Sequence, residues 1–190
     1  NIGSEGNISC RKKNEIYITP SGIKTSNLKQ NDISKVDLDG MILNENKPSS
    51  EILLHSWIYR NHEDIGAVVH SHSKWASILS CMRINIPAFH YMVAEFGGSD
   101  VKCSKYATFG SEQLSKYVNN VLHNRKGCLI AHHGQVTIAD TLEEAVDLSI
   151  ALEKLSEQYY FLIISRKAKL LSDKEMCKIV KLFKDYKVKH

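Results

Sequence analysis

The stretch Ala67-Val68-Val69-His70-Ser71-His72 decides the fold, because it joins the pattern of a buried strand to two histidines at the strand's end. A run of small and branched apolar residues is typical of a strand that is covered on both faces. Residues two apart in a strand point to the same face, so the imidazoles of His70 and His72 can converge on one metal ion. A chance occurrence is the alternative, since the chain has 9 histidines.

A second apolar run, from Cys128 to His132, also ends in histidines, at His132 and His133, just before Gly134. We expect residues 135–139 to continue this strand beyond the glycine. Catalytic zinc takes three protein ligands and keeps one position open, so this strand end can supply the third ligand. His132 and His133 point to opposite faces of a continuous strand, and the spacing alone does not say which of them binds.

Helical and strand patterns alternate along the rest of the chain. We expect strands over 15–19 and 101–107, a hairpin over 32–44 that turns at Asp39-Gly40, and helices over 48–60, 74–82, 88–96, 111–124, 141–163 and 172–184. Capping boxes, in which a hydroxyl and a carboxylate satisfy free N–H groups reciprocally, mark the starts of the last two helices. This alternation predicts an α/β domain in which helices cover a mixed sheet.

Length and composition limit the class of protein. With 190 residues, 43% of them apolar and 24% charged, the chain is expected to form one globular domain over 1–190. It has no apolar run of about eighteen residues and no signal-peptide pattern at its start, so we expect no membrane span and no signal peptide. The net charge of +4 is too small to indicate a nucleic-acid partner. An odd number of cysteines without a CxxC pair predicts free thiols in a reducing cytoplasm.

The segment Pro48-Ser49-Ser50-Glu51 combines a predicted helix start with hydroxyl and carboxylate side chains. The free N–H groups and positive dipole of a helix N-terminus can hold a phosphate, and Ser49 and Ser50 add hydroxyl donors. An ordinary N-cap is the alternative interpretation. Glu51 is a candidate general base, although a nearby cation and the helix N-terminus would lower its pKa unless a loop desolvates the carboxylate.

Two short loops, Gly6-Asn7 and Ser21-Gly22, lie beside predicted strands. Glycine permits close approach of the backbone to an anion, and asparagine and serine add hydrogen-bond donors. Taken singly, each loop is by default interpreted as a turn.

These segments form an ordered set along the chain: Gly6-Asn7-Ile8-Ser9, Thr19-Pro20-Ser21-Gly22, Pro48-Ser49-Ser50-Glu51, His70-Ser71-His72 and His132-His133-Gly134. In this order and spacing the chain resembles the class II sugar-phosphate aldolase and epimerase family, which also contains the adducin head domain. The likeness covers nearly the whole chain and is greatest to the family's L-fuculose-1-phosphate aldolase branch, especially over residues 86–92 and 106–110. The resemblance implies an α/β fold: a single domain with a mixed, mainly antiparallel central β-sheet covered by helices on both sides.

The resemblance also implies a role for each candidate residue. The metal ligands would be His70, His72 and His133, and the catalytic residues would be Glu51 and Tyr91. The phosphate would be bound by Asn7, Ser21, Gly22, Ser49 and Ser50. Phe109 would form a wall of the aldehyde pocket. The resemblance thereby favours His133 over His132 as the third metal ligand. The metal would be one Zn²⁺ per subunit, with another divalent ion as the alternative.

The activity that the resemblance implies is that of a lyase. It is the reversible cleavage of a ketose 1-phosphate like L-fuculose 1-phosphate into dihydroxyacetone phosphate and a short aldehyde such as lactaldehyde. The partners would be a small sugar phosphate and the chain itself, in a homotetramer with active sites at subunit interfaces, where Tyr91 would serve the neighbouring site. Members of the family carry a helix ahead of the Gly-Asn motif, so we expect that this chain lacks the helix or is a fragment.

Other proteins on the same scaffold are the alternatives. A 5-deoxyribulose 1-phosphate aldolase is not distinguished from the fuculose enzyme. A ribulose-phosphate 4-epimerase is disfavoured because such enzymes have Asp where this chain has Glu51. A methylthioribulose-phosphate dehydratase has Glu at the position of Glu51, but the sequences of such enzymes are less similar to residues 90–110 of this chain. A non-catalytic module like the adducin head is disfavoured because it lacks the metal histidines that are present here.

Overall fold

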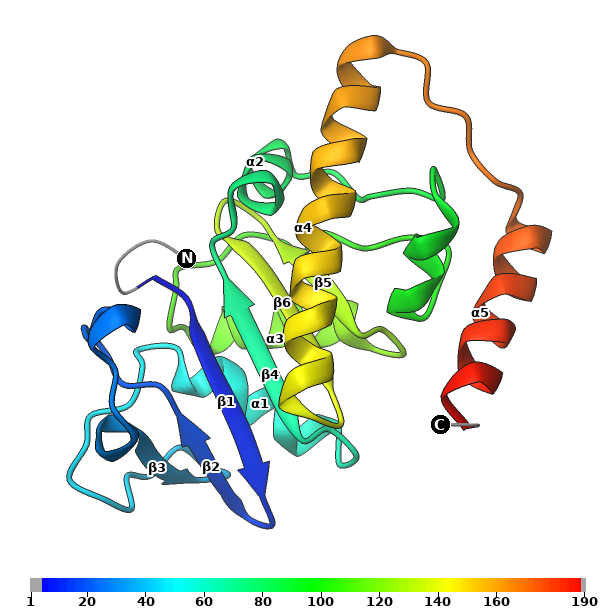
Figure 1. Cartoon of the computed structure of the whole chain (residues 1–190). Helices are drawn as coiled ribbons and strands as arrows, with labels where there is room; N and C mark the ends of the chain where they lie inside the picture. The colour runs from blue at the N-terminus through cyan, green and yellow to red at the C-terminus, as the bar shows by residue number, and fades with distance from the viewer. Residues whose placement is uncertain (1–4, 189–190) are drawn as a thin grey trace.

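The computed structural model describes residues 5–188, and a six-stranded sheet lies at its centre (Figure 1). The strands are β1 (Asn7–Lys12), β2 (Glu15–Ile18), β3 (Ser34–Asp37), β4 (Ala67–Ser71), β5 (Gly127–Ile130) and β6 (Gly134–Ala139). They stand in the order β3-β2-β1-β4-β6-β5, and each neighbouring pair is antiparallel. A parallel isolated bridge joins Cys103 to Leu129. The predicted α/β fold with a mainly antiparallel sheet is confirmed.

Helices cover both faces of this sheet (Figure 1). They are α1 (Ile52–Asn61), α2 (Lys74–Met82), α3 (Glu112–Leu122), α4 (Leu142–Ser165) and α5 (Asp173–Val188), with short 3-10 helices η1 (Thr25–Asn27), η2 (Gln30–Asp32) and η3 (Tyr91–Phe96). In β4, Val68 packs in the core that includes α1 and α3 residues, whereas Ala67 and Val69 pack in the core that includes α2 and α4 residues. Because β4 is buried at every residue, its sequence shows one apolar run rather than an alternation.

Residues 128–139 form a hairpin, so the expected continuation of one strand past Gly134 is wrong. The chain reverses at His132, which has a φ of +55°. The N–H of His133 then donates to the Ile130 carbonyl at 3.0 Å, and β6 returns between β4 and β5, antiparallel to both. A single left-handed residue causes this reversal, and the apolar pattern on either side of it contains no sign of the turn.

Two other predicted elements are shorter in the structure. Only residues 91–96 of the expected helix over 88–96 are helical, as η3. His90, with extended backbone, is the N-cap and accepts a hydrogen bond from the Met92 N–H at 3.2 Å, and Gly97, with a φ of +88°, ends the helix. The expected strand over 101–107 is reduced to isolated bridges at Val101 and Cys103. The hydroxyl half of each predicted capping box is present: the N–H groups of Glu144 and Glu175 donate to the hydroxyls of Thr141 and Ser172, each at 3.2 Å.

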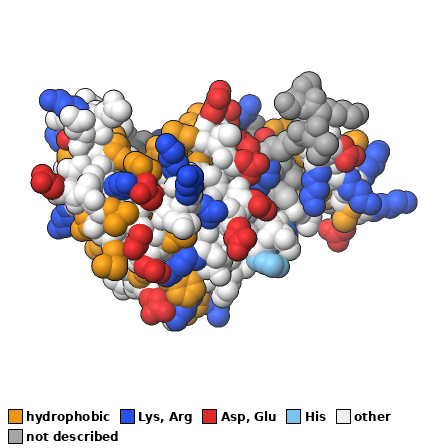
Figure 2. Space-filling view, turned by 90° about the horizontal axis from the view of Figure 1, so that it is seen from below, with side chains coloured by type: hydrophobic (Ala, Val, Ile, Leu, Met, Phe, Trp, Pro, Cys, Tyr) orange, Lys and Arg blue, Asp and Glu red, His pale blue; other side chains and the backbone are white. Residues whose placement is uncertain are grey.

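The surface agrees with the mild net charge. Basic and acidic side chains are interspersed over the face that Figure 2 shows, and lysines gather on α5, at the right-hand end of that view. The exposed lysines there are Lys174, Lys178, Lys181 and Lys184. Among the described residues, no helix combines the length and apolar character needed to cross a bilayer. The expectation about a helix ahead of Asn1 lies outside the described residues.

Candidate active site

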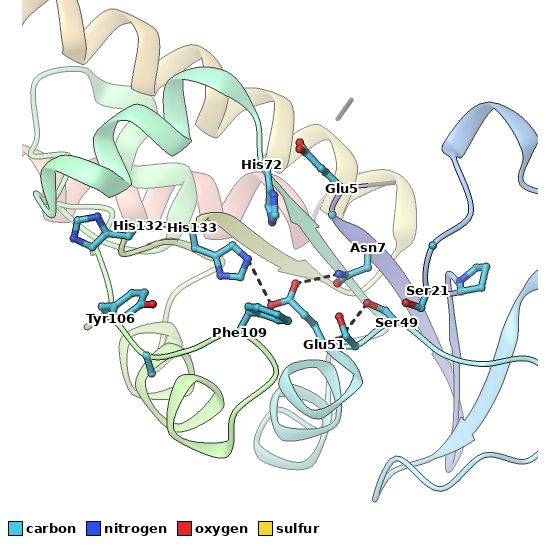
Figure 3. Close-up of a pocket in the computed structure, with 15 residues that line it drawn as sticks. Glu5, Asn7, Ser21, Ser49, Glu51, His72, Tyr106, Phe109, His132 and His133 are labelled. Atoms are coloured by element: carbon cyan, nitrogen blue, oxygen red, sulfur yellow. Dashed lines mark hydrogen bonds and ion pairs between the residues drawn. The ribbon is translucent and has the colours of Figure 1, made fainter. Parts of the chain in front are cut away.

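Four side chains from three separate motifs meet near the end of β4. Their nearest possible ligand atoms lie within 4.8 Å of one another, and they belong to Glu51, His70, His72 and His133. His70 Nε2 lies 3.0 Å from His72 Nε2 and 2.9 Å from Glu51 Oε2. His133 Nε2 lies 3.6 Å from Glu51 Oε1. Figure 3 shows His72 and His133 directed toward Glu51, whereas His132 points away from it.

Each of these side chains is positioned by a different local structure. His70 belongs to β4 and is completely buried. His72 follows where the chain leaves β4 toward α2, so it stays on the same side as His70. The left-handed turn at His132 carries the next residue, His133, back toward the end of β4. Glu51 is the N-cap residue of α1, at the positive end of the helix dipole.

The three imidazoles are in a form that can donate lone pairs to a metal ion. His70 Nδ1 lies 2.8 Å from the backbone oxygen of Gln135, which can only accept, so Nδ1 carries the proton and Nε2 faces the cluster. Burial lowers the pKa values of His72 and His133, and the pKa of His133 falls to about 4. His72 and His133 are therefore neutral near pH 7.

The donor set fits a divalent cation. Glu51 Oε1 is buried without a hydrogen-bond partner, although it lies beside the His133 ring. His70 and His72 bring two imidazole nitrogens to 3.0 Å, where their lone pairs repel unless a proton or a cation lies between them. Two nitrogens bound tetrahedrally to one zinc ion lie at a similar separation, about 3.3 Å. The four side chains therefore form a cluster that is able to hold a divalent metal ion.

Glu51 is buried but remains ionised. Burial by itself would raise its pKa, but the contacts with His70 and a hydrogen bond from Asn7 Nδ2 at 3.1 Å together lower the pKa below its usual range. The carboxylate is therefore in its basic form at neutral pH.

A pocket of about 400 Å³ opens beside the cluster (Figure 3). Its lining includes the residues that were expected to bind phosphate and the aldehyde: Asn7, Ser21, Gly22, Ser49, Ser50 and Phe109. In Figure 3, Asn7, Ser21 and Ser49 lie to one side of Glu51, and Phe109 lies toward the other. The pocket thus has a polar side and an aromatic side.

The pocket differs from the sequence-based expectation at its edges. Tyr91 is not among its lining residues; it begins η3, has 52% of its surface exposed and stacks on the ring of His90 at 4.9 Å. Tyr106, which had no expected role, and His132, the alternative third ligand by spacing, do line the pocket and meet edge to face at 5.7 Å. The available signal for Tyr106 was its place in the segment 106–110.

The chain matches the family described as class II aldolase and adducin N-terminal domain over residues 1–160. It is 40% identical over 186 residues to a 5-methylthioribulose-1-phosphate/5-deoxyribulose-1-phosphate aldolase of Rhodospirillum rubrum, covering 98% of this chain and 84% of that protein. It is 37% identical over 187 residues to the L-fuculose phosphate aldolase of Escherichia coli K12, covering 98% and 87%. A solved structure of L-fuculose 1-phosphate aldolase matches with a TM-score of 0.92 and 34% identity, over 96% of this chain and 87% of the other.

These relatives are named as aldolases, and the likeness extends over nearly the whole chain in both sequence and structure. The resemblance found in the sequence motifs is thereby confirmed. The protein is a lyase of the class II aldolase type, with a cluster that is able to bind a metal ion. The chain belongs to the class II aldolase and adducin N-terminal domain family.

Proposed function

We propose that this enzyme is a zinc-dependent aldolase that reversibly cleaves a ketose 1-phosphate into dihydroxyacetone phosphate and a short aldehyde. The observation that carries the proposal is the cluster of Glu51, His70, His72 and His133 beside a pocket with one polar and one aromatic side. Three imidazoles with an open position are the ligand set of catalytic zinc. The five free cysteines fit a reducing cytoplasm, where we place the enzyme.

The metal would be held by His70, His72 and His133. When bound, it would supply Lewis-acid stabilisation of negative charge on the substrate's oxygens. The backbone oxygen of Gln135 supports this role, because it fixes the ring of His70 with Nε2 toward the cluster.

Glu51 is the acid/base at the substrate carbon. When the C3–C4 bond breaks, its electron pair stays on C3, which must then take up a proton. In the aldol direction the Glu51 carboxylate removes a proton from C3. In cleavage the O4 hydroxyl of the substrate loses its proton as the aldehyde forms, and Glu51, once it has been protonated, delivers one to C3. The lowered pKa of the carboxylate favours the basic form before substrate binds.

The polar side of the pocket holds the phosphate through Asn7, Ser21, Gly22, Ser49 and Ser50. Gly22 has a φ of +79° and no atom within 4 Å of the place where a Cβ would stand, so an anion can approach its backbone closely. Ser49 Oγ accepts a hydrogen bond from the Glu51 N–H at 3.3 Å, which leaves its own hydroxyl proton to donate. A phosphate held here fixes the position of C3 relative to Glu51.

Tyr91 acts from a neighbouring subunit of a homotetramer. Its half-exposed ring lies outside the pocket of its own chain, and η3 lies between α4 and α5 (Figure 1). In the aldol direction, Tyr91 donates the proton that the aldehyde oxygen takes up. The active site of each subunit is then complete only in the oligomer.

The aldehyde is the part of the substrate on which the relatives differ. One is named for 5-methylthioribulose and 5-deoxyribulose 1-phosphates, and another for L-fuculose phosphate. Phe109 is the proposed wall of the aldehyde site. An aromatic wall accepts the apolar end group of a 5-deoxy or 5-methylthio sugar as readily as it accepts the end of the sugar that leaves as lactaldehyde. The 5-deoxy and 5-methylthio sugars are therefore a second candidate substrate class, which the 40% identity to the Rhodospirillum enzyme favours.

The test is release of dihydroxyacetone phosphate from a panel of ketose 1-phosphates, measured before and after chelation and again after zinc is added back. We expect release that stops with the chelator and returns with zinc, and the best substrate then identifies the aldehyde. A zinc-loaded protein that releases no dihydroxyacetone phosphate from any panel member would refute the proposed reaction. A product of dehydration or epimerisation would then point to the alternatives on the same scaffold.

A further inference from the structure

A row of buried hydrogen bonds leads from Glu51 away from the pocket, into the interface between β1 and α1. Asn7 Nδ2 donates to Glu51 Oε2 at 3.1 Å, and Asn7 Oδ1 lies 2.6 Å from His55 Nε2. On the other side of the ring, His55 Nδ1 lies 2.6 Å from Ser9 Oγ. Asn7, Ser9 and His55 are all buried, and His55 is completely inaccessible. The proposed reaction gives His55 and Ser9 no role.

The chemistry of the groups allows one direction for these hydrogen bonds. A carboxylate only accepts, so the atom of Asn7 beside Glu51 must belong to its NH₂ group, and the amide oxygen faces His55. An amide oxygen also only accepts, so His55 Nε2 must carry a proton. Burial lowers the pKa of His55 to about 3, so the ring is neutral. Nδ1 is then an acceptor, and the hydroxyl of Ser9 donates to it.

The ring of His55 therefore distinguishes the two ends of the Asn7 amide. A flipped amide would place its oxygen against the carboxylate of Glu51 and its NH₂ group against the N–H of His55, and both contacts would be repulsive. Hydrogen bonds at 2.6 Å on both sides of the ring hold His55 itself in place. The phenol of Tyr59 lies 2.9 Å from Ser9 Oγ and donates to the Ser9 carbonyl at 3.0 Å, which continues the network into the core.

We propose that His55 is a positioning residue for the reaction: its Nε2–H locks the Asn7 amide with the NH₂ group toward Glu51, and this holds the carboxylate in its working orientation. The inference rests on the proposed acid/base role of Glu51. His55 itself is separated from the pocket by Asn7 and touches no reacting atom.

Two replacements of His55 separate positioning from packing. Glutamine carries its amide group as far out as Nε2, so His55→Gln can keep the donor to Asn7. Asparagine reaches only as far as Nδ1, so His55→Asn loses that donor. We expect kcat for release of dihydroxyacetone phosphate to fall about 10- to 100-fold in His55→Asn, the usual effect of removing a residue that orients an active-site group, and to stay within a few-fold of the wild type in His55→Gln.

A matched control breaks the same network on the far side of the ring. Ser9→Ala removes the hydrogen bond to Nδ1 and leaves the contact between Nε2 and Asn7. We expect it to lower the melting temperature about as much as His55→Asn while keeping kcat near the wild-type value. Metal content, measured on all variants, should stay at the wild-type stoichiometry.

A double-mutant cycle with Asn7→Ala tests whether His55 acts through Asn7. If it does, His55→Asn has no further effect on kcat once Asn7 is alanine. A full additional loss in that background, or equal losses in His55→Gln and His55→Asn, would show that His55 acts through packing and would overturn the inference.

A spectroscopic measurement tests the arrangement without turnover. In metal-free protein with ¹⁵N-labelled histidine, the ring signals lost in His55→Asn should be those of a neutral ring protonated at Nε2. A ring protonated at Nδ1, or at both nitrogens, near pH 7 would overturn the inference even if the aldolase reaction is established. An inactive wild type with the Nε2–H ring would instead refute the proposed function and leave the lock between His55 and Asn7 in place.

Discussion

Glu51 has unlike surroundings on its two carboxylate oxygens. Oε2 lies against His70 and Asn7, whereas Oε1 is buried without a hydrogen-bond partner beside His133. A carboxylate that is fixed through one oxygen keeps the other available for a substrate proton. This asymmetry fits an acid/base better than a residue that serves only to balance the charge of a metal.

Replacing Glu51 with glutamine separates these two roles. Glu51→Gln keeps the shape of the side chain but removes its ability to exchange a proton, so we expect turnover to fall by about 10²–10⁴. Metal content should be unchanged, because His70, His72 and His133 remain. Release of dihydroxyacetone phosphate and elemental analysis of the same sample measure both quantities. Turnover close to that of the wild type would exclude Glu51 as the acid/base.

The two histidines of the β5–β6 turn offer a matched pair of variants. His133→Ala removes a member of the metal cluster, so we expect loss of metal binding and of activity. His132→Ala changes the neighbouring residue, which points away from Glu51 (Figure 3), and should keep its metal. Titration of the metal-free proteins with zinc compares them. Equal affinities in the two variants would contradict the assignment of His133 as a ligand.

The sequence predicted which residue types gather at this site, but it did not decide between His132 and His133 by spacing. That choice depends on the backbone of one residue, the left-handed His132, which turns an apparently continuous strand into a hairpin. The role of His55 was also out of reach, because it depends on a contact between residues 48 positions apart. Local patterns contain no information about such contacts.

At the scale of the elements, the β5–β6 hairpin must approach the end of β4 closely to bring His133 to the other ligands. A Cβ on Gly134 would lie 2.3 Å from the backbone oxygen of Ser71, the residue before His72. Because the obstacle is backbone, it can be relieved only if the hairpin and β4 move apart. The spacing of the metal cluster therefore depends on the absence of a side chain at Gly134.

Gly134→Ala should weaken both the fold and the metal site. We expect a loss of about 1–3 kcal/mol in the free energy of unfolding, typical of overpacking, together with lower zinc affinity. Gly98→Ala is the control, since the atoms nearest to a Cβ there belong to the end of the Arg125 side chain, which can move. Denaturant unfolding and zinc titration measure the two effects. Wild-type zinc affinity in Gly134→Ala would show that the ligand spacing tolerates displacement of the hairpin.

Pattern reasoning predicted the helices and strands of this chain better than their connections. Long helical segments such as α4 and capped starts such as that of Thr141 are local features, and both were predicted. The segment 88–96 is helical only from residue 91, and the segment 101–107, predicted as a strand, forms only isolated bridges, so tertiary context shortened both elements.

At the scale of the whole molecule, the polar pocket of one subunit lacks a residue that the proposed reaction requires. Glu51 and the three histidines come from one chain, while Tyr91 lies on η3, outside the pocket of that chain. A second subunit can supply the missing phenol, and closed symmetric oligomers repeat such a contribution at every site. Activity would then require assembly, even though each subunit folds around its own core.

Co-expression of two inactive variants tests this arrangement. In mixed oligomers of Glu51→Gln and Tyr91→Phe, a site is intact when its own subunit supplies Glu51 and its neighbour supplies Tyr91. Random mixing of equal amounts makes this true of roughly a quarter of the sites, so we expect about that fraction of wild-type turnover to return. Mixed oligomers, purified through two different tags, are compared with each variant alone.

The control for that experiment pairs Glu51→Gln with His133→Ala, two changes within one chain's own cluster. A site needs both Glu51 and His133 from the same subunit, and every subunit of this mixture lacks one of them. Turnover should therefore stay as low as in the separate variants. Recovery in both mixtures would indicate exchange or repair unrelated to Tyr91. Recovery in neither, with mixed oligomers shown to be present, would remove Tyr91 from the neighbouring site. Its half-exposed ring would then require another explanation, since the described fold holds it away from the pocket of its own subunit.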